Sequence, residues 1–410
     1  MVLADIDEAV VRGVAERIAG ENCRVEFDAM SFDDIEEPLI LVTIDPAANR
    51  HDPVQSNWTR SKLLIIESIV ERLDAKQALL NRLMRRFGDR AIYTTNTSTL
   101  RIATVNDGLV DRDKLSGLHF FMPVPERHAV EWIVPAVVGS AVDGTANDGS
   151  ARGGSASTWR SIEPVIRRHA ERLGKTVFRA PDTPGFIVNR LLSPYLNEAL
   201  LMACEGAGAR AIRDAALEIG MPISPFELID LIGVQTMFDA GRVYWQAFPD
   251  RFTPSPTIGR WIKRKRRRDK AADNSSATVG SDLIGAKDDS APERRLVHPD
   301  RPDRYTAEAE VLWTQYRRRY PPIDGGDIRD RLALPMINEM NFLMRGETDA
   351  DVERLSEGSI AAAVAGGLAM RSERALSLIA ESISPDRRRE IVTRYGERSA
   401  AIASRNRWIC

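Results

Sequence analysis

The chain has 410 residues, 43% of them hydrophobic, and a formal net charge of −2 at pH 7. This length allows two or three domains with sizeable cores, and a charge near zero gives no general attraction to nucleic acid or to anionic membranes. Cys23, Cys204 and Cys410 show no metal-ligand spacing, and their odd number suits a reducing cytoplasm. Because no run of about 18 apolar residues and no basic-then-apolar leader is present, we expect a cytoplasmic protein without a membrane span.

The N-terminal third of the chain predicts an α/β arrangement. Val2–Asp5 reads as a short strand ending in an acid, and apolar residues follow at helical spacing over Glu8–Ala19. Pro38–Ile44 is a further strand-like run. Leu63–Ile66 is typical of a fully buried strand, and Glu71–Leu83 predicts a helix with one apolar side.

Two apolar runs joined by a proline-rich turn, GLHFFMPVPERHAVEWI over 117–133, hold the clearest candidate site. The first run contains His119 and the second contains Glu131, and a hairpin-like pair would bring the two side chains together. A carboxylate bonded to one ring nitrogen fixes the histidine tautomer and suits the other nitrogen for work as a general base. From these residues alone, the alternative is a structural strand histidine beside an unrelated acid.

The chain continues with a segment rich in glycine and serine over 138–158, which predicts a flexible surface insertion. Trp159–Leu173 then predicts a helix, and Lys175–Arg179 predicts the last strand of the first domain. Pro184 and Gly185 mark the passage to a helix that carries Asn189 near its start. A helix-start asparagine is more often a local cap or a surface group than a functional residue.

The C-terminal half contains an internal repeat. The pattern Pro-x-[Leu/Ile]-Asn-Glu occurs at Pro194–Glu198 and again at Pro335–Glu339, and chance similarity is the alternative explanation. Between the two copies lies a stretch poor in apolar residues, which predicts a disordered linker. Its basic run Lys263–Arg268 lacks interleaved aromatic residues, so we expect no nucleic-acid partner. Tyr305–Ser382 predicts a helical unit, and the tail after Pro385 predicts a terminal helix.

Several motifs, taken in order, resemble the 3-hydroxyacyl-CoA dehydrogenase family, whose pattern includes SNTSSL, GLHFFNPVP, LVEVI and DTPGFIVNRLL. The resemblance covers roughly Leu63 to Gly233. It implies NAD-dependent oxidation of an L-3-hydroxyacyl-CoA to the 3-oxoacyl-CoA in fatty-acid β-oxidation. Because the chain has two helical units, it is most similar to the fatty-acid oxidation complex α-subunit, although the hydratase domain of that subunit has no counterpart here. The matching segments are LLIIESIVE at 63–71, NTS at 96–98, GLHFFMPVP at 117–125, DTPGFIVNRLL at 182–192 and MPISPFELID at 221–230.

The resemblance also implies a role for individual residues, and NAD and an acyl-CoA as cofactor and substrate. Without it, the charges of Glu71 and Lys76 would be read as a solvated first helical turn. The implied site residues are His119 as general base, Glu131 as the carboxylate that orients it, Asp5 at the adenosine ribose, Glu71 and Lys76 near the nicotinamide, Ser98 at nicotinamide and substrate, and Asn189 at the substrate.

Two departures from the family pattern lower the expected activity. The first Rossmann strand and its Gly-x-Gly-x-x-Gly turn, which would hold the pyrophosphate, should precede Val2 and are absent from the sequence. Either the sequence starts too late, a segment such as Pro38–Ile44 fills the gap, or the domain is a remnant. Met122 stands where the family has asparagine, and the loss of one hydrogen bond of about 1–3 kcal/mol predicts a slower enzyme.

We therefore predict an N-terminally incomplete Rossmann-type α/β domain followed by two all-α helical units of the 6-phosphogluconate-dehydrogenase type. The alternative function is a non-catalytic remnant or a structural subunit of a fatty-acid oxidation complex. We expect a homodimer or a thiolase-type partner bound through the helical domains, and no metal, because the other histidines lack partnered motifs. The predicted boundaries are 1–181 for the NAD-binding domain, 182–259 for the first helical domain, 260–304 for the linker and 305–410 for the second helical domain.

Overall fold

The computed structural model describes residues 2–5, 24–30, 39–45, 63–112, 114–135, 156–263, 295–317, 320–345 and 355–403. The chain divides into two compact units, Met1–Lys62 and Leu63–Cys410. This division falls inside the predicted domain 1–181, whose C-terminal limit stays a prediction. The predicted helix over Glu8–Ala19 and almost all of the predicted surface insertion lie outside the described residues.

The first unit contains an antiparallel sheet of the strand order β1-β3-β2, formed by β1 (Val2–Asp5), β2 (Arg24–Met30) and β3 (Leu39–Asp45). The two strands predicted from the sequence are confirmed, and β2 was not predicted. The family resemblance implies that Val2–Asp5 is the second strand of the nucleotide-binding sheet, but here β1 pairs antiparallel with β3 and places Asp5 opposite Ile40. A strand needs hydrogen-bond partners along its edge, and β3 supplies them for β1.

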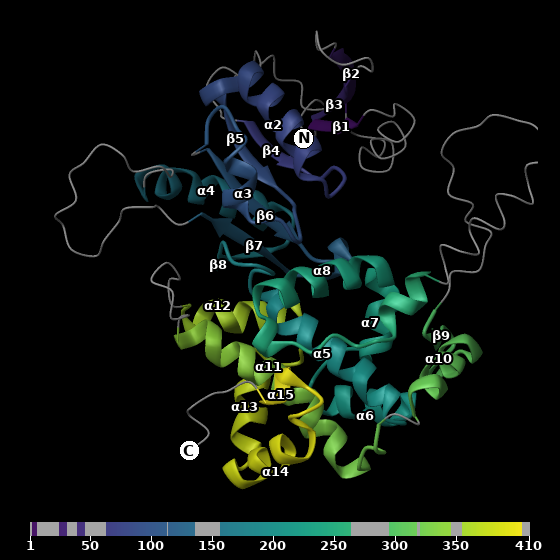
Figure 1. Cartoon of the computed structure of the whole chain (residues 1–410). Helices are drawn as coiled ribbons and strands as arrows, with labels where there is room; N and C mark the ends of the chain where they lie inside the picture. Colours follow the sequence, from purple (N-terminus) through teal and green to yellow (C-terminus); the bar gives the residue numbers. More distant parts are fainter. Residues whose placement is uncertain are drawn as a thin grey trace, which may run out of the picture. The chain divides into compact units, whose positions relative to one another are not determined.

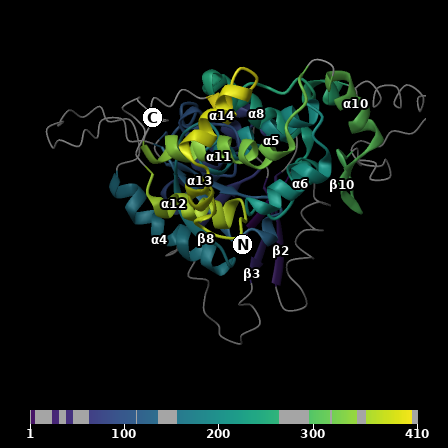
Figure 2. The same ribbon diagram turned by 90° about the horizontal axis from the view of Figure 1, so that it is seen from below.

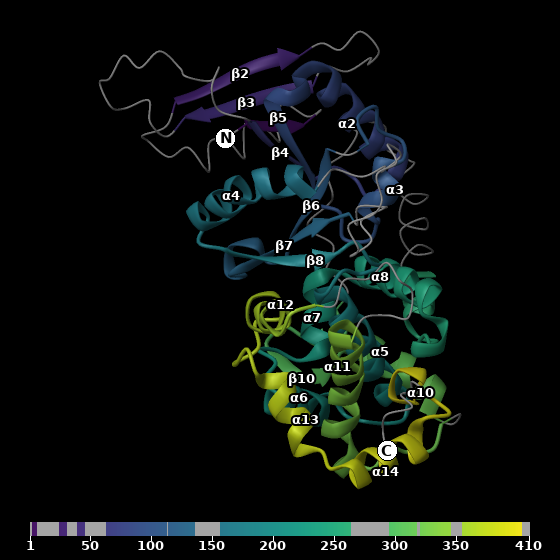
Figure 3. The same ribbon diagram turned by 90° about the vertical axis from the view of Figure 1, so that its left-hand side faces the viewer.

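The second unit begins with a five-stranded sheet of the order β4-β5-β6-β7-β8, in which all neighbours are parallel except β6 and β7. β6 and β7 can be antiparallel because only a short proline-rich turn joins them. Helices cover both faces (Figure 3), which confirms a Rossmann-type core. The elements are β4 (Leu63–Glu67), α2 (Leu73–Phe87), β5 (Ala91–Thr95), α3 (Ile102–Asn106), β6 (Leu115–Phe120), β7 (Ala129–Val134), α4 (Ala156–Arg172) and β8 (Thr176–Pro181).

The alternation of side chains along β7 explains the two faces. Trp132 packs with Trp159 and Ile166 of α4 in one apolar cluster, whereas Ile133 packs into the cluster that contains Leu80 of α2. Both faces of the sheet are therefore buried, and the polar loops at the carboxyl ends of β4 and β5 are left to form a site.

The remainder of the second unit is mostly helical. The repeat is confirmed as two equivalent helices, α5 and α11, which pack side by side at its centre (Figures 1 and 2). Among the described residues, no helix is both long enough and apolar enough to cross a lipid bilayer. The elements are α5 (Val188–Cys204), α6 (Ala209–Glu218), α7 (Pro225–Ile232), α8 (Val234–Ala247), β9 (Val297–His298), β10 (Arg301–Tyr305), α10 (Ala307–Arg317), α11 (Ile328–Arg345), α12 (Glu357–Ala362), a π-helical turn η7 (Ala363–Gly367), α13 (Ala375–Ser382), α14 (Pro385–Tyr395) and α15 (Ala400–Ala403).

The predicted disorder of the linker 260–304 is wrong at both of its ends. Residues 260–263 are helical and Trp261 is buried, and the last ten residues contain β9 and most of β10. Leu296 and Val297 are buried, and the carboxylate of Asp230 on α7 accepts hydrogen bonds from the backbone N–H of Leu296 at 2.8 and 2.9 Å. The buried apolar pair and the Asp230 carboxylate hold this end of the segment against α7. Residues 264–294 lie outside the described part of the chain.

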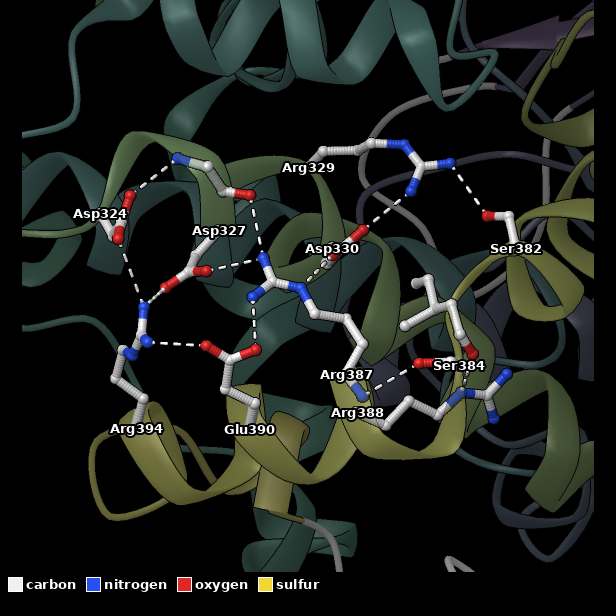
Figure 4. Close-up of polar contacts among 12 residues, drawn as sticks. Asp324, Asp327, Arg329, Asp330, Ser382, Ser384, Arg387, Arg388, Glu390 and Arg394 are labelled. Carbon is white, nitrogen blue, oxygen red and sulfur yellow. Dashed lines mark hydrogen bonds and ion pairs between the residues drawn. The ribbon is translucent and has the colours of Figure 1, made fainter.

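The helix α14, near the C-terminus, is held to the start of α11 by charged hydrogen bonds (Figure 4). The carboxylate of Asp327 is 1% exposed and accepts from Arg387, Arg394 and Tyr395. The Nε of Arg387 also donates to Asp330 at 2.8 Å. Burial acts to raise the pKa of Asp327, but the hydrogen bonds from Tyr395 and the two arginines outweigh it and lower this pKa. The network is structural and ties the predicted terminal helix to the helical core.

Candidate active site

His119 on β6 and Glu131 on β7 lie directly opposite each other in the antiparallel pair. The Nδ1 of His119 lies 2.7 Å from Oε2 of Glu131, and the two residues are only 5% and 0% exposed. The predicted pairing of these side chains is therefore confirmed. Because Nδ1 is bound to the carboxylate, Nε2 is the ring nitrogen left for chemistry.

The second oxygen of Glu131 is used by the helix that follows the sheet. Its Oε1 accepts hydrogen bonds of 2.9 Å from the backbone N–H groups of Ile187 and Val188, at the N-terminus of α5. Helix N-terminal N–H groups have no partner within the helix and favour negative charge. Glu131 therefore links the imidazole to α5 with both of its oxygens satisfied.

Aromatic rings hold the imidazole from two directions. Phe121 meets His119 edge-on at a centroid distance of 5.1 Å, and Phe186 lies at 5.7 Å. Phe186 has φ 50 directly after Gly185 with φ 81, so a non-glycine residue occupies the left-handed region beside the site. Such strain persists where the surroundings over-determine it and is common at active sites.

Ser98 and Asn189, which come from distant parts of the sequence, meet next to His119. The Nδ2 of Asn189 donates to the backbone carbonyl of Ser98 at 3.1 Å, and Oδ1 of Asn96 accepts from the backbone N–H of Phe120 at 2.9 Å. Ser98, His119 and Asn189 line one cavity of about 220 Å³. The structure thus brings these three predicted residues together.

Glu71 organises the turn that carries Ser98. Its Oε1 accepts from the backbone N–H groups of Ser98 and Thr99 at 3.1 and 3.0 Å, and from the hydroxyl groups of Thr97 and Thr99. Burial acts to raise the pKa of Glu71, but the hydrogen bonds from Thr97 and Thr99 and the charge of Lys76 outweigh it and hold the pKa below its usual value. The Glu71 carboxylate is thus hydrogen-bonded to the turn that carries Ser98, and it is not a freely solvated charge.

Lys76 is completely buried. Its Nζ lies 2.9 Å from Oε1 of Glu67 and 3.3 Å from Oε2 of Glu71. Glu67 was missed in the sequence, although it ends a buried strand and also accepts from the hydroxyl of Thr95 at 2.6 Å. Lys76 therefore holds the carboxylates of Glu67 and Glu71 in place. It is not among the residues that line the cavity.

Asp5 and Met122 are the other two positions that the sequence singles out. Asp5 belongs to the first unit, and its predicted role at the adenosine ribose stays a prediction. Met122 lines the cavity with its side chain 61% exposed, and its backbone carbonyl accepts from Nε of Arg127 at 3.1 Å. Burial lowers the pKa of Arg127.

Most of the cavity wall was not predicted as functional. Apolar side chains of three neighbouring helices and a segment of the second helical unit line it. Their helical spacing in the sequence indicates burial but does not distinguish a core from a binding cavity. The unpredicted apolar residues include Leu192 and Leu196 of α5, Leu228 of α7, Met237 of α8, and Gly367 and Leu368.

A Rossmann-type sheet is typical of α/β enzymes that use a nucleotide cofactor. Here the His119–Glu131 pair lies between this sheet and the N-terminus of α5, as expected for an enzyme of this class. Two domain models of one family match the sequence. The model described as 3-hydroxyacyl-CoA dehydrogenase, NAD binding domain, matches residues 1–142, and the model of the C-terminal domain matches residues 185–275. Together they cover more than half of the chain. The chain belongs to the 3-hydroxyacyl-CoA dehydrogenase family, and NAD is the cofactor of the matched N-terminal domain.

Named relatives agree with this family. The chain is 32% identical over 207 residues to the mitochondrial hydroxyacyl-coenzyme A dehydrogenase of Rattus norvegicus, covering 50% of this chain and 60% of the relative. It is 35% identical over 175 residues to the Homo sapiens enzyme of the same name, covering 42% and 49%. The chain thus matches less than two thirds of the length of these relatives.

One solved structure supports the fold over most of the chain. The 3-hydroxybutyryl-CoA dehydrogenase of Escherichia coli is similar with a TM-score of 0.54 and 21% identity, covering 83% of this chain and 80% of that one. At this identity the similarity establishes the fold alone.

Proposed function

We propose that the chain oxidises L-3-hydroxyacyl-CoA to 3-oxoacyl-CoA with NAD in fatty-acid β-oxidation. The observation that carries the proposal is the 2.7 Å contact between His119 Nδ1 and the buried Glu131, beside a cavity that His119, Ser98 and Asn189 line together. A histidine oriented by a buried carboxylate is suited to remove a proton from an alcohol near neutral pH.

The proton passes from the 3-hydroxyl of the substrate to Nε2 of His119. Glu131 stabilises the resulting imidazolium. Its hydrogen bonds to Ile187 and Val188 also hold the imidazole in a fixed position relative to the start of α5. Ser98 and Asn189 hold the reacting oxygen and the thioester region. NAD, when bound, supplies the acceptor for the hydride that leaves C3.

The residues at the carboxyl ends of β4 and β5 fit the nicotinamide end of NAD. Glu71 holds the turn that presents Ser98, and Lys76 supports Glu71 from below, so we propose that Lys76 acts on the cofactor site through Glu71. Asp5 is proposed to bind the adenosine ribose hydroxyls.

The remaining partners are also proposals. An acyl-CoA is the substrate class that the family suggests. A homodimer or a thiolase-type partner bound through the helical domains remains our proposal, as does a cytoplasmic location, although the rat and human relatives are named as mitochondrial.

A direct test is NADH formation by the full 410-residue chain with a series of L-3-hydroxyacyl-CoA thioesters, monitored by NADH fluorescence. The D-enantiomers serve as matched control substrates. We expect NADH with the L-series only. Absence of NADH with every chain length, together with no NAD binding by calorimetry, would instead favour the non-catalytic remnant or structural subunit.

A further inference from the structure

We propose that the second helical unit forms part of the wall of this cavity and that Leu368 sets the length of the apolar acyl chain that the cavity accepts. The identity of the ligand as an acyl-CoA rests on the proposed function. The placement of the wall rests on the contacts of the π-helical turn η7 and the residue that follows it.

The turn η7 approaches the sheet and α5 more closely than any side chain would allow. A Cβ on Gly366 would lie 2.3 Å from Cβ of Ala129 on β7, and a Cβ on Gly367 would lie 2.5 Å from Cγ2 of Val188 on α5. Both distances are far below a van der Waals contact, so the two glycines are required for this approach. Ala129 lies on the strand of Glu131, and Val188 donates its backbone N–H to that carboxylate.

The approach places Leu368 in the cavity wall. Its side chain is 3% exposed, and it lines the same cavity as His119 although it comes from the second helical unit. Its backbone N–H donates to Ala363 at 2.9 Å. Its backbone carbonyl lies 3.5 Å from Nη1 of Arg127, the same guanidinium that binds the Met122 carbonyl. Leu368 is thus anchored from its own turn and from the loop after His119.

The chemistry of the lining selects an apolar ligand. Leu192, Leu196, Leu228 and Met237 face the cavity, and Arg127 is the one permanently charged residue among those that line it. Nε and Nη1 of this arginine are directed to backbone carbonyls. An alkyl chain gains free energy by leaving water for such an apolar space, whereas the phosphates of CoA would lose their hydration there. The ligand part that fits is therefore the acyl tail.

The test compares Leu368→Ala and Leu368→Phe with Leu378→Ala, a matched change at a leucine that is 48% exposed on α13. Binding of saturated acyl-CoA thioesters of increasing length is measured by calorimetry without NAD, and kcat/KM for the L-3-hydroxyacyl-CoA series is measured in parallel. In the unaltered protein, affinity should rise roughly fourfold for each methylene until the chain reaches Leu368, and then level off. Leu368→Ala should move this limit to chains longer by about two methylenes. Leu368→Phe should move it to shorter chains, and Leu378→Ala should leave it unchanged.

The two variants shift the limit in opposite directions, so loss of stability in one of them cannot imitate the result. An unchanged limit in both variants, or no acyl-CoA binding at all by the unaltered chain, would overturn the proposal. Binding with the expected shifts but without turnover would support the role of Leu368 in limiting the acyl chain and would contradict the proposed function. Turnover with an identical length profile in all variants would support the function and contradict the wall.

Discussion

Arg190 of α5 donates to Glu339 of α11 through Nε at 3.1 Å and Nη2 at 3.0 Å, and the equivalent pair is formed in the opposite direction. Arg331 of α11 donates through Nε to Glu198 of α5 at 2.6 Å. Arg190 precedes Pro194 at the spacing at which Arg331 precedes Pro335, so each helix offers the same arginine and glutamate to the other. The internal repeat of the sequence is therefore a crossed pair of buried ion pairs that joins the two helical units.

Removing one partner of a crossed pair should be costly. Glu339→Gln leaves the fully buried guanidinium of Arg190 without its carboxylate, and we expect a loss of about 3–5 kcal/mol in the free energy of unfolding. The measurement is urea-induced unfolding. Glu381→Gln is the matched control, because Glu381 faces Arg374 at 4.0 Å with both side chains about two-thirds exposed, and it should change stability by no more than about 0.5 kcal/mol. Equal effects of the two changes would contradict the structural role of the crossed pairs.

Glu71 predicts a specific pH dependence of stability. Its folded pKa lies below the unfolded value, so its stabilising contribution is complete above the unfolded pKa and is lost as the pH falls through the folded pKa. The side chain is 37% exposed, and we therefore expect only about 1 kcal/mol. The difference in unfolding free energy between the unaltered chain and Glu71→Gln should be present near pH 6 and should shrink below about pH 4. A difference that grew on acidification would contradict this sign.

Cys204 should be inert in the folded protein. Burial raises the pKa of its thiol to about 12, and the thiolate is the reactive form. In a chain with Cys23→Ser and Cys410→Ser, labelling of Cys204 by a thiol reagent at about pH 8 should be at least a hundredfold slower than for an unfolded chain. Equally fast labelling in the absence and presence of urea would show that this part of α5 is open to solvent.

Met122 offers a gain-of-function test. Asparagine at this position would restore an amide at the cavity, and one such hydrogen bond predicts a rise in kcat of roughly tenfold in Met122→Asn. Met122→Leu removes the sulfur without adding an amide and should leave kcat unchanged. If both changes have the same effect on steady-state turnover, the departure from the family pattern does not limit the rate.

The elements nearest the site could be predicted because their signals are local. The two apolar runs that contain His119 and Glu131 predict two strands, and the short proline-rich turn between them predicts a hairpin-like pair, which is the antiparallel pair that the structure contains. Asn189 could be placed at a helix start from Pro184 and Gly185. In each case neighbouring residues determine the local structure.

Other features depend on contacts that the sequence does not reveal. Lys76 is buried because the carboxylates of Glu67 and Glu71 both lie against its ammonium group. From the sequence, its charge alone favoured a position in solvent. The order of residues 295–304 depends on Asp230, which lies far away in the sequence. The pairing of β1 with β3 and the approach of Gly366 to Ala129 are likewise non-local.

The most direct test of the His119 mechanism is kcat/KM for L-3-hydroxyacyl-CoA oxidation in His119→Gln compared with His128→Gln. His128 is an exposed histidine just before β7, so its replacement controls for the loss of an imidazole. If His119 is the general base, His119→Gln should lower kcat/KM by about 10²–10⁴-fold, and His128→Gln should retain the rate of the unaltered chain. Retention of activity in a folded His119→Gln protein would contradict the mechanism proposed for the His119–Glu131 pair.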